Sequence, residues 1–152
     1  MRFVGDFQAK TDAKGRVFLP AAFRKILEAE GELELVLRRD VFQHCLVLYP
    51  ESVWNQQLDE LKQGLNQWNR EHQMMLRQFL LDAEVLEWDS QGRILLSKRK
   101  MQYAGIENDV RFLAMVDRIE IWGKQEYEKL MEQSGNLGDE LEQMFGQDNQ
   151  VK

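Results

Sequence analysis

The chain has 152 residues and a formal net charge of −6, and 43% of its residues are hydrophobic. This composition supplies a core and excludes wholesale disorder. A single cysteine, Cys45, excludes an internal disulfide and favours a reducing compartment. No stretch approaches the roughly 18 uninterrupted apolar residues of a membrane-spanning helix, and the N-terminal residues show no signal-peptide pattern. We therefore expect a cytoplasmic protein.

A short motif occurs twice in the chain. Residues 12–19 read Asp-Ala-Lys-Gly-Arg-Val-Phe-Leu, and residues 89–96, which lie 77 positions later, read Asp-Ser-Gln-Gly-Arg-Ile-Leu-Leu. Downstream, residues 46–50 resemble residues 119–123 at an offset of 73, because the first copy has a longer connection over residues 38–44. A repeat that tolerates a loop insertion but keeps its ends is a duplicated structural unit. Two copies are too few for a solenoid, so we expect one pseudo-symmetric body.

The first copy has the pattern of a hairpin, a helix and two strands. Asp12 and Gly15 predict a tight turn, because an Asp side chain accepts hydrogen bonds from nearby amides and Gly permits positive φ. Pro20 suits the first position of a helix, and Gly31 is placed to end it. The expected elements are strands over 3–11 and 16–19, the helix from 20 to 31, and strands over 33–37 and 45–48.

The second copy repeats this order from about residue 83, with Ser97 in the place of Pro20 and Gly105 in the place of Gly31. Between the copies, bulky apolar residues recur at spacings of four and three, which predicts one amphipathic helix or two helices separated near Gly64. We interpret this stripe as core or subunit interface. The expected domains are repeat 1 over 5–53, a helical connection over 54–82, repeat 2 over 83–126, and a C-terminal helix with an acidic tail over 127–152, frayed from 147 onward.

Although the net charge of the whole chain is negative, basic and acidic residues are concentrated in different segments. Between positions 7 and 27 there are five basic residues and one acidic residue, and residues 90–106 hold four basic residues and none that is acidic. Eleven of the 26 acidic residues lie from Glu107 onward. Because local potential decides where a polyanion docks, the net charge does not exclude nucleic-acid binding.

Two interpretations of the arginine in each repeated motif stay open. Arg16 and Arg93 either pair with Asp12 and Asp89 across their own turns, or are presented by those turns to grip a phosphate or a guanine edge. A surface pair contributes only about 0–1 kcal/mol, so stability alone is a weak reason for the arrangement. Four further basic residues crowd around the first motif and are candidates for phosphate contacts: Lys10, Lys14, Arg24 and Lys25.

Nothing in the sequence predicts an enzyme or a cofactor site. Two histidines and one cysteine provide no readable catalytic constellation, and there is neither a glycine-rich phosphate loop nor zinc-ligand spacing. His44 next to Cys45 does not predict a metal site, because adjacent residues rarely chelate together. We expect no metal, no cofactor and no small-molecule substrate.

The motifs resemble those of the MraZ family of bacterial transcriptional regulators, which is associated with the division and cell-wall gene cluster. The resemblance runs from residue 3 to about residue 130 and includes both Asp-x-x-Gly-Arg motifs, Phe18-Leu19-Pro20, Leu48-Tyr49-Pro50-Glu51 and residues 117–122. It implies an α+β, mainly β fold, in which two AbrB-like units form a pseudo-symmetric swapped-hairpin β-barrel with flanking amphipathic helices. It also implies ring-shaped homo-oligomers that bind short repeated promoter elements.

The resemblance places the two motif arginines, Arg16 and Arg93, at the DNA surface. In AbrB-like proteins a basic pair at the end of the helix also approaches DNA, which here corresponds to Arg24 and Lys25. The second copy departs from this pattern, because Met101 and Gln102 stand at those positions and the basic cluster shifts to residues 98–100. That cluster contacts either DNA or the acidic surface of a neighbouring subunit.

We therefore predict a nucleoid-associated, sequence-specific DNA-binding regulator, in which several copies at fixed spacing engage tandem promoter elements and repress transcription. The alternative is an AbrB-like protein-binding module, either an antitoxin or an assembly scaffold. In that case the 98–100 cluster and the helical stripe are partner surfaces and Arg16 is a turn residue.

Overall fold

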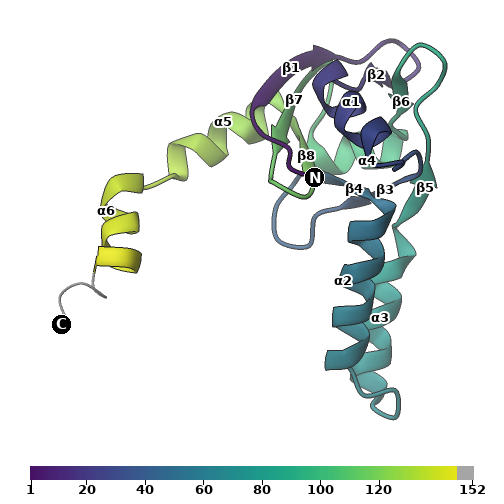
Figure 1. Ribbon diagram of the computed structural model, residues 1–152, viewed down its shortest axis with the longest axis vertical. Helices are drawn as coiled ribbons and strands as arrows, with labels where there is room; N and C mark the ends of the chain where they lie inside the picture. The colour runs from purple at the N-terminus through teal and green to yellow at the C-terminus, as the bar shows by residue number, and fades with distance from the viewer. Residues whose placement is uncertain (147–152) are drawn as a thin grey trace.

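The computed structural model describes residues 1–146 of the chain. These residues form an α+β fold with a mainly antiparallel sheet, six α-helices and a final π-helical turn (Figure 1). The strands are β1 Asp6–Lys10, β2 Arg16–Phe18, β3 Leu35–Arg39, β4 Leu46–Pro50, β5 Glu84–Leu86, β6 Arg93–Leu95, β7 Asp109–Ala114 and β8 Ile119–Gly123. The helices are α1 Ala21–Ala29, α2 Glu51–Gly64, α3 Arg70–Leu81, α4 Lys98–Ala104, α5 Lys124–Gln133 and α6 Leu137–Leu141, and the π-helical turn is Glu142–Gly146.

The two copies of the repeat are interleaved in the sheets. The six-stranded sheet has the order β1-β7-β8-β4-β3-β5, so the first strand of each copy pairs with the third strand of the other copy. The second strands, β2 and β6, pair with each other in a separate two-stranded ladder. Within the described residues the larger sheet is open, with β1 and β5 at its edges, so the expected closed barrel is not confirmed.

The strand registers reveal a pseudo-two-fold axis. Val17 lies opposite Ile94 in the ladder, and these residues are equivalent positions of the two copies. Val47 lies opposite Glu120 in the large sheet, and these residues are again equivalent. Since each pair straddles the same axis, the two copies form one pseudo-symmetric body, as the sequence repeat predicts.

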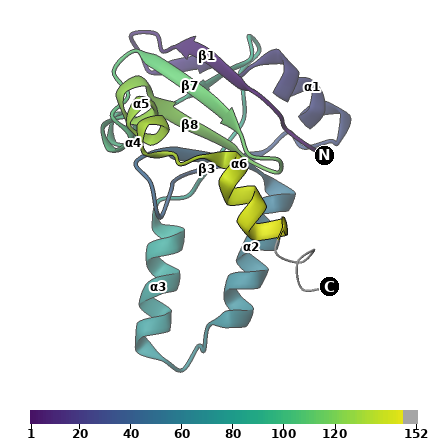
Figure 2. The same cartoon turned by 90° about the vertical axis from the view of Figure 1, so that its left-hand side faces the viewer.

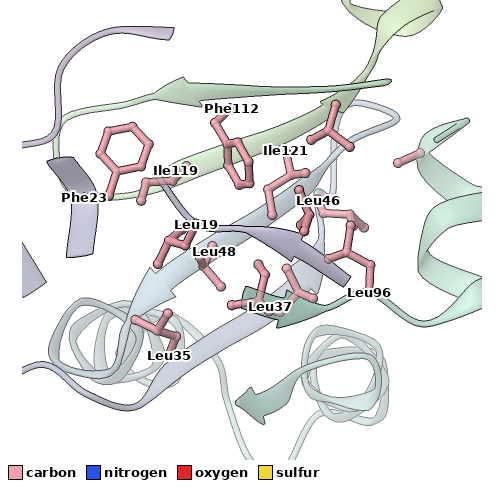
Figure 3. Close-up of a cluster of buried hydrophobic side chains, with 14 of the residues drawn as sticks. Leu19, Phe23, Leu35, Leu37, Leu46, Leu48, Leu96, Phe112, Ile119 and Ile121 are labelled. Carbon is pink, nitrogen blue, oxygen red and sulfur yellow. The ribbon is translucent and has the colours of Figure 1, made fainter. Parts of the chain in front are cut away.

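The core lies between the ladder and the large sheet. Alternate residues of the ladder strands, such as Val17 and Ile94, point inward and are fully buried, as are Leu19 and Leu96 just beyond them. They meet a layer of side chains from the central strands of the sheet, most of which Figure 3 shows: Leu35, Leu37, Leu46, Leu48, Phe112, Ile119 and Ile121. Burying one such side chain stabilises the fold by about 1.5–3 kcal/mol, so the shared core binds the copies together.

Several element boundaries differ from the sequence prediction by one to three residues. The predicted strand over 3–11 begins only at Asp6, because Phe3 forms an isolated bridge with Val116. Pro20 is the N-cap of α1 and not its first residue. β3 extends to Arg39, because its pairing with β4 continues from Leu35–Pro50 to Arg39–Leu46. The remaining connection is then short, and the Asp40 amide donates to the Cys45 carbonyl oxygen across it at 2.9 Å.

The α2–α3 hairpin projects from the body as an arm (Figures 1 and 2). The predicted break at Gly64 is confirmed, and Asn69 caps α3 by accepting hydrogen bonds from the first-turn amides. Near the body, Trp54 is 7% exposed and stacks on Phe79 with ring centroids 5.3 Å apart. At the tip, Trp68 is 86% exposed. Within the described residues, the part of the apolar stripe nearest the body is therefore core, whereas Trp68 at the tip is not buried.

The C-terminal helices α5 and α6 lead away from the sheet on another side of the body (Figure 1). Among residues 1–146, no helix is long and apolar enough to cross a membrane. The predicted fraying of residues 147–152 lies outside the described residues.

Candidate nucleic-acid interface

The first repeated motif folds into a tight turn held by the side chain of Asp12. Its Oδ1 atom accepts hydrogen bonds from the amides of Lys14 and Arg16, both at 2.9 Å. The Gly15 amide donates to the Asp12 carbonyl oxygen at 3.0 Å, and Gly15 has a φ of +87°. Positive φ is the conformation for which Gly carries no steric cost, which explains the residue at this position.

The second motif has the same turn. Asp89 Oδ1 accepts from the amides of Gln91 and Arg93, both at 2.9 Å. The Gly92 amide donates to the Asp89 carbonyl oxygen at 2.9 Å, and its φ is also +87°. The two turns are therefore built by the same local hydrogen bonds.

Each turn aspartate also fixes the arginine that follows it. Arg16 Nε lies 2.7 Å from Asp12 Oδ2, and Arg93 Nε lies 2.9 Å from Asp89 Oδ2. Two hydrogen bonds from the arginine lower the pKa of each aspartate carboxyl below its usual range. The bond from the arginine's backbone amide has the larger effect, and the bond from its side chain has the smaller one. Within the described residues no hydrogen bond engages the Nη atoms of either arginine, so each guanidinium keeps donors for a phosphate or a base edge.

The β2–β6 ladder brings the two arginines onto one surface. Arg16 lies opposite Leu95, and Arg93 lies opposite Phe18. Because side chains alternate along a strand and Val17 points into the core, these four side chains share the outer side of the ladder. The two arginines are diagonal neighbours, a relation that places residues about 7–8 Å apart. We name the surface made by Arg16, Phe18, Arg93 and Leu95 the ladder face.

The sequence analysis missed Phe18 and Leu95 as site residues. Phe18 is 56% exposed and Leu95 is 58% exposed, so both add apolar area to the outer side of the ladder. The Arg93 guanidinium lies 6.0 Å from the centroid of the Phe18 ring. The alternation of side chains along a strand predicts, from the sequence alone, that Phe18 points outward. Only the pairing of β2 with β6 shows that Phe18 lies next to Arg93.

Three of the four flanking basic residues are exposed. Lys10 ends β1, Lys14 lies at the tip of the turn, and Lys25 lies on α1. Arg24 is placed differently, because it is half-buried and its Nε donates to the Leu19 carbonyl oxygen at 3.1 Å.

Arg24 packs against the turn of the other copy. A Cβ atom added to Gly92 would lie 2.7 Å from Arg24 Cζ, so the guanidinium sits directly over that glycine. The equivalent residue of the second copy is Met101, and its Sδ would lie 3.4 Å from a Cβ added to Gly15. Each helix thus supports the turn of the opposite copy.

Neither sequence interpretation of the 98–100 cluster holds for Lys100. This residue is buried, and its Nζ lies 3.0 Å from Glu84 Oε1 and 3.9 Å from Asp82 Oδ1. Both acidic partners belong to the same chain. They lie in the segment that begins the second copy, next to α4. Lys98 and Arg99 remain exposed.

The described residues offer no other chemical centre. Between residues 1 and 146 there is no group of three or more His, Cys, Asp or Glu side chains that could hold a metal ion. Cys45 is fully buried, and burial raises the pKa of its thiol far above the ordinary value, which keeps it protonated and unreactive.

Comparison with known proteins identifies the family. The family model described as MraZ protein, antitoxin-like, matches residues 2–78 and again residues 79–148. The chain belongs to the MraZ family. Each matched range contains one Asp-x-x-Gly-Arg turn, so the duplicated turn is a feature of both MraZ units of this chain.

The chain is similar over nearly its whole length to curated MraZ proteins. It is 52% identical to the transcriptional regulator MraZ of Phocaeicola vulgatus, over 100% of this chain and 99% of that protein. It is 50% identical to that of Bacteroides fragilis, over 99% and 96% of the two chains. It is 33% identical to that of Lachnoclostridium phytofermentans, over 83% and 84%. The family is one of transcriptional regulators and not of enzymes, so no catalytic role is assigned to the ladder face.

Proposed function

We propose that this protein is a sequence-specific DNA-binding transcriptional regulator and that the ladder face binds the DNA. One observation carries the proposal: two arginines from two copies of the motif stand on a single exposed surface, each held by an aspartate through Nε. A guanidinium fixed in this way loses little additional conformational entropy when it binds a guanine edge or a phosphate. The names of the curated relatives support the regulatory role.

The remaining residues divide into positioning and reading roles. Lys10 and Lys14, exposed beside the first turn, and Lys25, exposed on α1, contact phosphates and fix the register of the protein on the duplex. Arg24 contributes positive charge from beside the second turn. Phe18 and Leu95 add apolar surface that suits the methyl group of thymine.

In this proposal residues 5–53 and 83–126 are the two repeats, and both contribute to one DNA-binding body. The β2–β6 ladder and the large sheet together form the swapped-hairpin barrel that the family resemblance implies. Support comes from the core, because the inward side chains of the ladder belong to the same buried cluster as those of the sheet.

The protein further acts as a ring-shaped homo-oligomer on tandem promoter elements of the division and cell-wall gene cluster, at the nucleoid in the cytoplasm. A single ladder face is small, so several copies at fixed spacing are needed for tight binding. Occupied promoter elements block transcription, which makes the protein a repressor. Exposed apolar side chains on the distal α2–α3 hairpin support self-assembly.

The alternative is a protein-binding module, an antitoxin or a scaffold, which the antitoxin-like description of the family favours. In that case the exposed hairpin binds a partner protein. Dependence on salt separates the two functions, because contacts with several phosphates weaken steeply as salt rises, whereas an apolar interface hardly changes.

The test is a titration of the full-length protein with DNA from upstream of its own operon and with unrelated DNA of the same length, at several salt concentrations. The proposal expects a preference for the upstream DNA and a steep linear fall of log affinity with log salt. Equal binding of both DNAs at low salt would contradict it and favour the protein-binding alternative.

A further inference from the structure

Within the described residues, the chain after α5 forms an amphipathic helix whose large apolar side chains are left exposed. Residues 137–146, which we name the tail helix, comprise α6 and the π-helical turn that continues it. Its large apolar side chains are Leu137, Leu141, Met144 and Phe145, and all four are exposed. Spacings of four, three and one place them on one side of a helix. Such a stripe is the side that a helix ordinarily buries.

The tail helix is acidic on both flanks of that stripe. Glu140 and Glu142 directly flank Leu141 in the chain, at the end of α6 and the start of the π-helical turn, and Asp139 precedes Glu140. From residue 130 to residue 146 there is no basic residue. A binding site for this segment therefore needs an apolar floor with positive charge at its edges.

The distal α2–α3 hairpin has a groove with this character. A cavity of about 330 Å³ lies between the helices near the tip, and we name it the hairpin groove. Leu65 and Leu76 give it an apolar lining, and Lys62, His72 and Arg77 bring basic groups to it. Within residues 1–146 neither Lys62 nor Arg77 forms an ion pair with a carboxylate, so both charges are available.

The groove and the tail helix of one chain do not meet. Figure 1 shows α6 on one side of the molecule and the α2–α3 hairpin projecting on another, with the sheet between their points of attachment. A tail helix that fills the groove must therefore come from a second copy of the chain.

We propose that the tail helix of one copy docks in the hairpin groove of a second copy. Leu141 and Phe145, one turn apart, enter between Leu65 and Leu76 in the manner of a helix bound in a groove. The acidic flanks of the tail helix then face Lys62 and Arg77 across the groove edges. Such complementarity favours this partner over others by making wrong pairings repulsive.

This contact uses two different surfaces, so every copy offers one free groove and one free tail. A head-to-tail interface of this kind continues from copy to copy and closes into a ring when the rotation permits. The inference rests on the proposed self-assembly and names the surfaces that produce it. It places the contact away from the ladder face, which stays free for DNA.

Disulfide trapping between copies tests the contact directly. Full-length chains carrying Leu76→Cys are mixed with chains carrying Leu141→Cys under mild oxidation, and the mixed dimer is quantified by mass. Native Cys45 is fully buried and does not compete. We expect efficient cross-linking of this pair. The control pairs Leu76→Cys with Gln143→Cys, because Gln143 is exposed on the polar side of the tail helix, and we expect much weaker cross-linking there.

A charge-exchange series tests the same contact without cysteine. In sedimentation velocity we expect Lys62→Glu/Arg77→Glu and Glu140→Lys/Glu142→Lys each to need about a tenfold higher concentration for half-assembly than the native chain. The chain with all four substitutions is expected to regain native assembly. All four residues lie on exposed or half-buried helix positions, and unfolding measurements on each variant verify the fold.

Two results would overturn the proposal and are distinguishable. A native chain that stays monomeric at every concentration refutes the proposed self-assembly together with this contact. A native chain that assembles, while the charge variants sediment as it does and both cysteine pairs cross-link equally, refutes this contact alone. DNA binding by the ladder face is measured separately and stands or falls independently of either result.

Discussion

The two Asp-x-x-Gly-Arg turns have the same backbone geometry but different neighbours. Gly15 and Gly92 share a φ of +87°, and each carbonyl oxygen accepts a hydrogen bond of 2.9 Å from the opposite copy. The Gly92 turn is covered by the flexible, charged Arg24, whereas the Gly15 turn lies against Met101 and the Leu96 backbone. The duplicated chain has thus kept the hydrogen bonds that build the turn, while the side chains that pack on it have diverged.

The exposed charge has diverged as well. The tip of the first turn carries Lys14, where the second turn has Gln91. The Arg16 side chain is 34% exposed and that of Arg93 is 20% exposed. Of the basic cluster at residues 98–100 in the second copy, Lys100 is buried and paired with Glu84. We therefore expect the first copy to contribute more to DNA binding than the second.

The largest expected effect is the loss of affinity on removing the motif arginines. A bidentate contact with a base is worth about 1–3 kcal/mol, so Arg16→Ala should weaken binding of the upstream DNA by roughly 5- to 150-fold. Arg93→Ala should weaken it less, because that side chain is less exposed. Arg70→Ala is the matched control, since Arg70 is an exposed arginine at the start of α3, outside the ladder face. Titration at one stated salt concentration measures all three, and an equal loss for Arg70→Ala would refute the assignment.

The next effect concerns stability and separates the two glycines. An alanine at either position adopts a strained positive φ, which costs on the order of 1–3 kcal/mol. At Gly15 the new Cβ also lies 2.6 Å from the Leu96 carbonyl oxygen, which is backbone and yields little. At Gly92 it meets the movable Arg24 side chain, so Gly92→Ala should destabilise less. Chemical denaturation measures the difference, with Gly64→Ala as the control because nothing lies within 4 Å of it. A larger loss at Gly92 would contradict this account.

A smaller effect follows from exchanging the turn tips. Lys14→Gln gives the first turn the tip of the second, and should lower the slope of log affinity against log salt by about 0.9, the contribution of one phosphate contact. Gln91→Lys makes the reverse change at the second turn and should raise the magnitude of the slope by about 0.9 if that turn also reaches a phosphate. Titrations over a range of salt measure both slopes. An unchanged slope for Lys14→Gln would show that the first tip does not touch the backbone of DNA.

The smallest expected effect is the pH dependence of the folding stability that the Asp–Arg pairs of the two turns contribute. The pKa of Asp12 and of Asp89 lies below the ordinary value in the folded state, so each carboxylate contributes stability that is present above the unfolded pKa of about 3.9. That contribution is lost as pH falls through the folded pKa. The double variant Asp12→Asn/Asp89→Asn should therefore be less stable than the native chain at pH 7, and the difference should shrink as the pH falls below the unfolded pKa and through the lowered folded pKa. A difference in unfolding free energy that stays constant with pH would speak against the pairs.

Local chemistry predicted a good part of the fold from the sequence. The turn glycines, the helix breaks near Gly31 and Gly105, and the split at Gly64 were predictable because each depends on residues close in the chain. The interleaving of the copies was implied only by the family resemblance, since β1 pairs with β7 through a core assembled from both copies.

The candidate site was predicted less completely, for the same reason. The motif identified Arg16 and Arg93, but the neighbours that define the ladder face, Phe18 and Leu95, follow from a pairing across 77 residues. The Lys100 side chain looked like surface charge, because its partner Glu84 lies 16 residues earlier and meets it only in the folded chain. Long-range packing decides both cases.

Photo-cross-linking from the ladder face tests the central claim most directly. The photoreactive amino acid p-benzoyl-phenylalanine replaces Phe18 in one full-length chain and Trp68 at the hairpin tip in another, both of which are exposed aromatic positions. Each chain is irradiated with the upstream DNA. The account predicts cross-linking to DNA from position 18 and none from position 68. Cross-linking from position 68 but not from position 18 would contradict it and move the DNA interface to the hairpin.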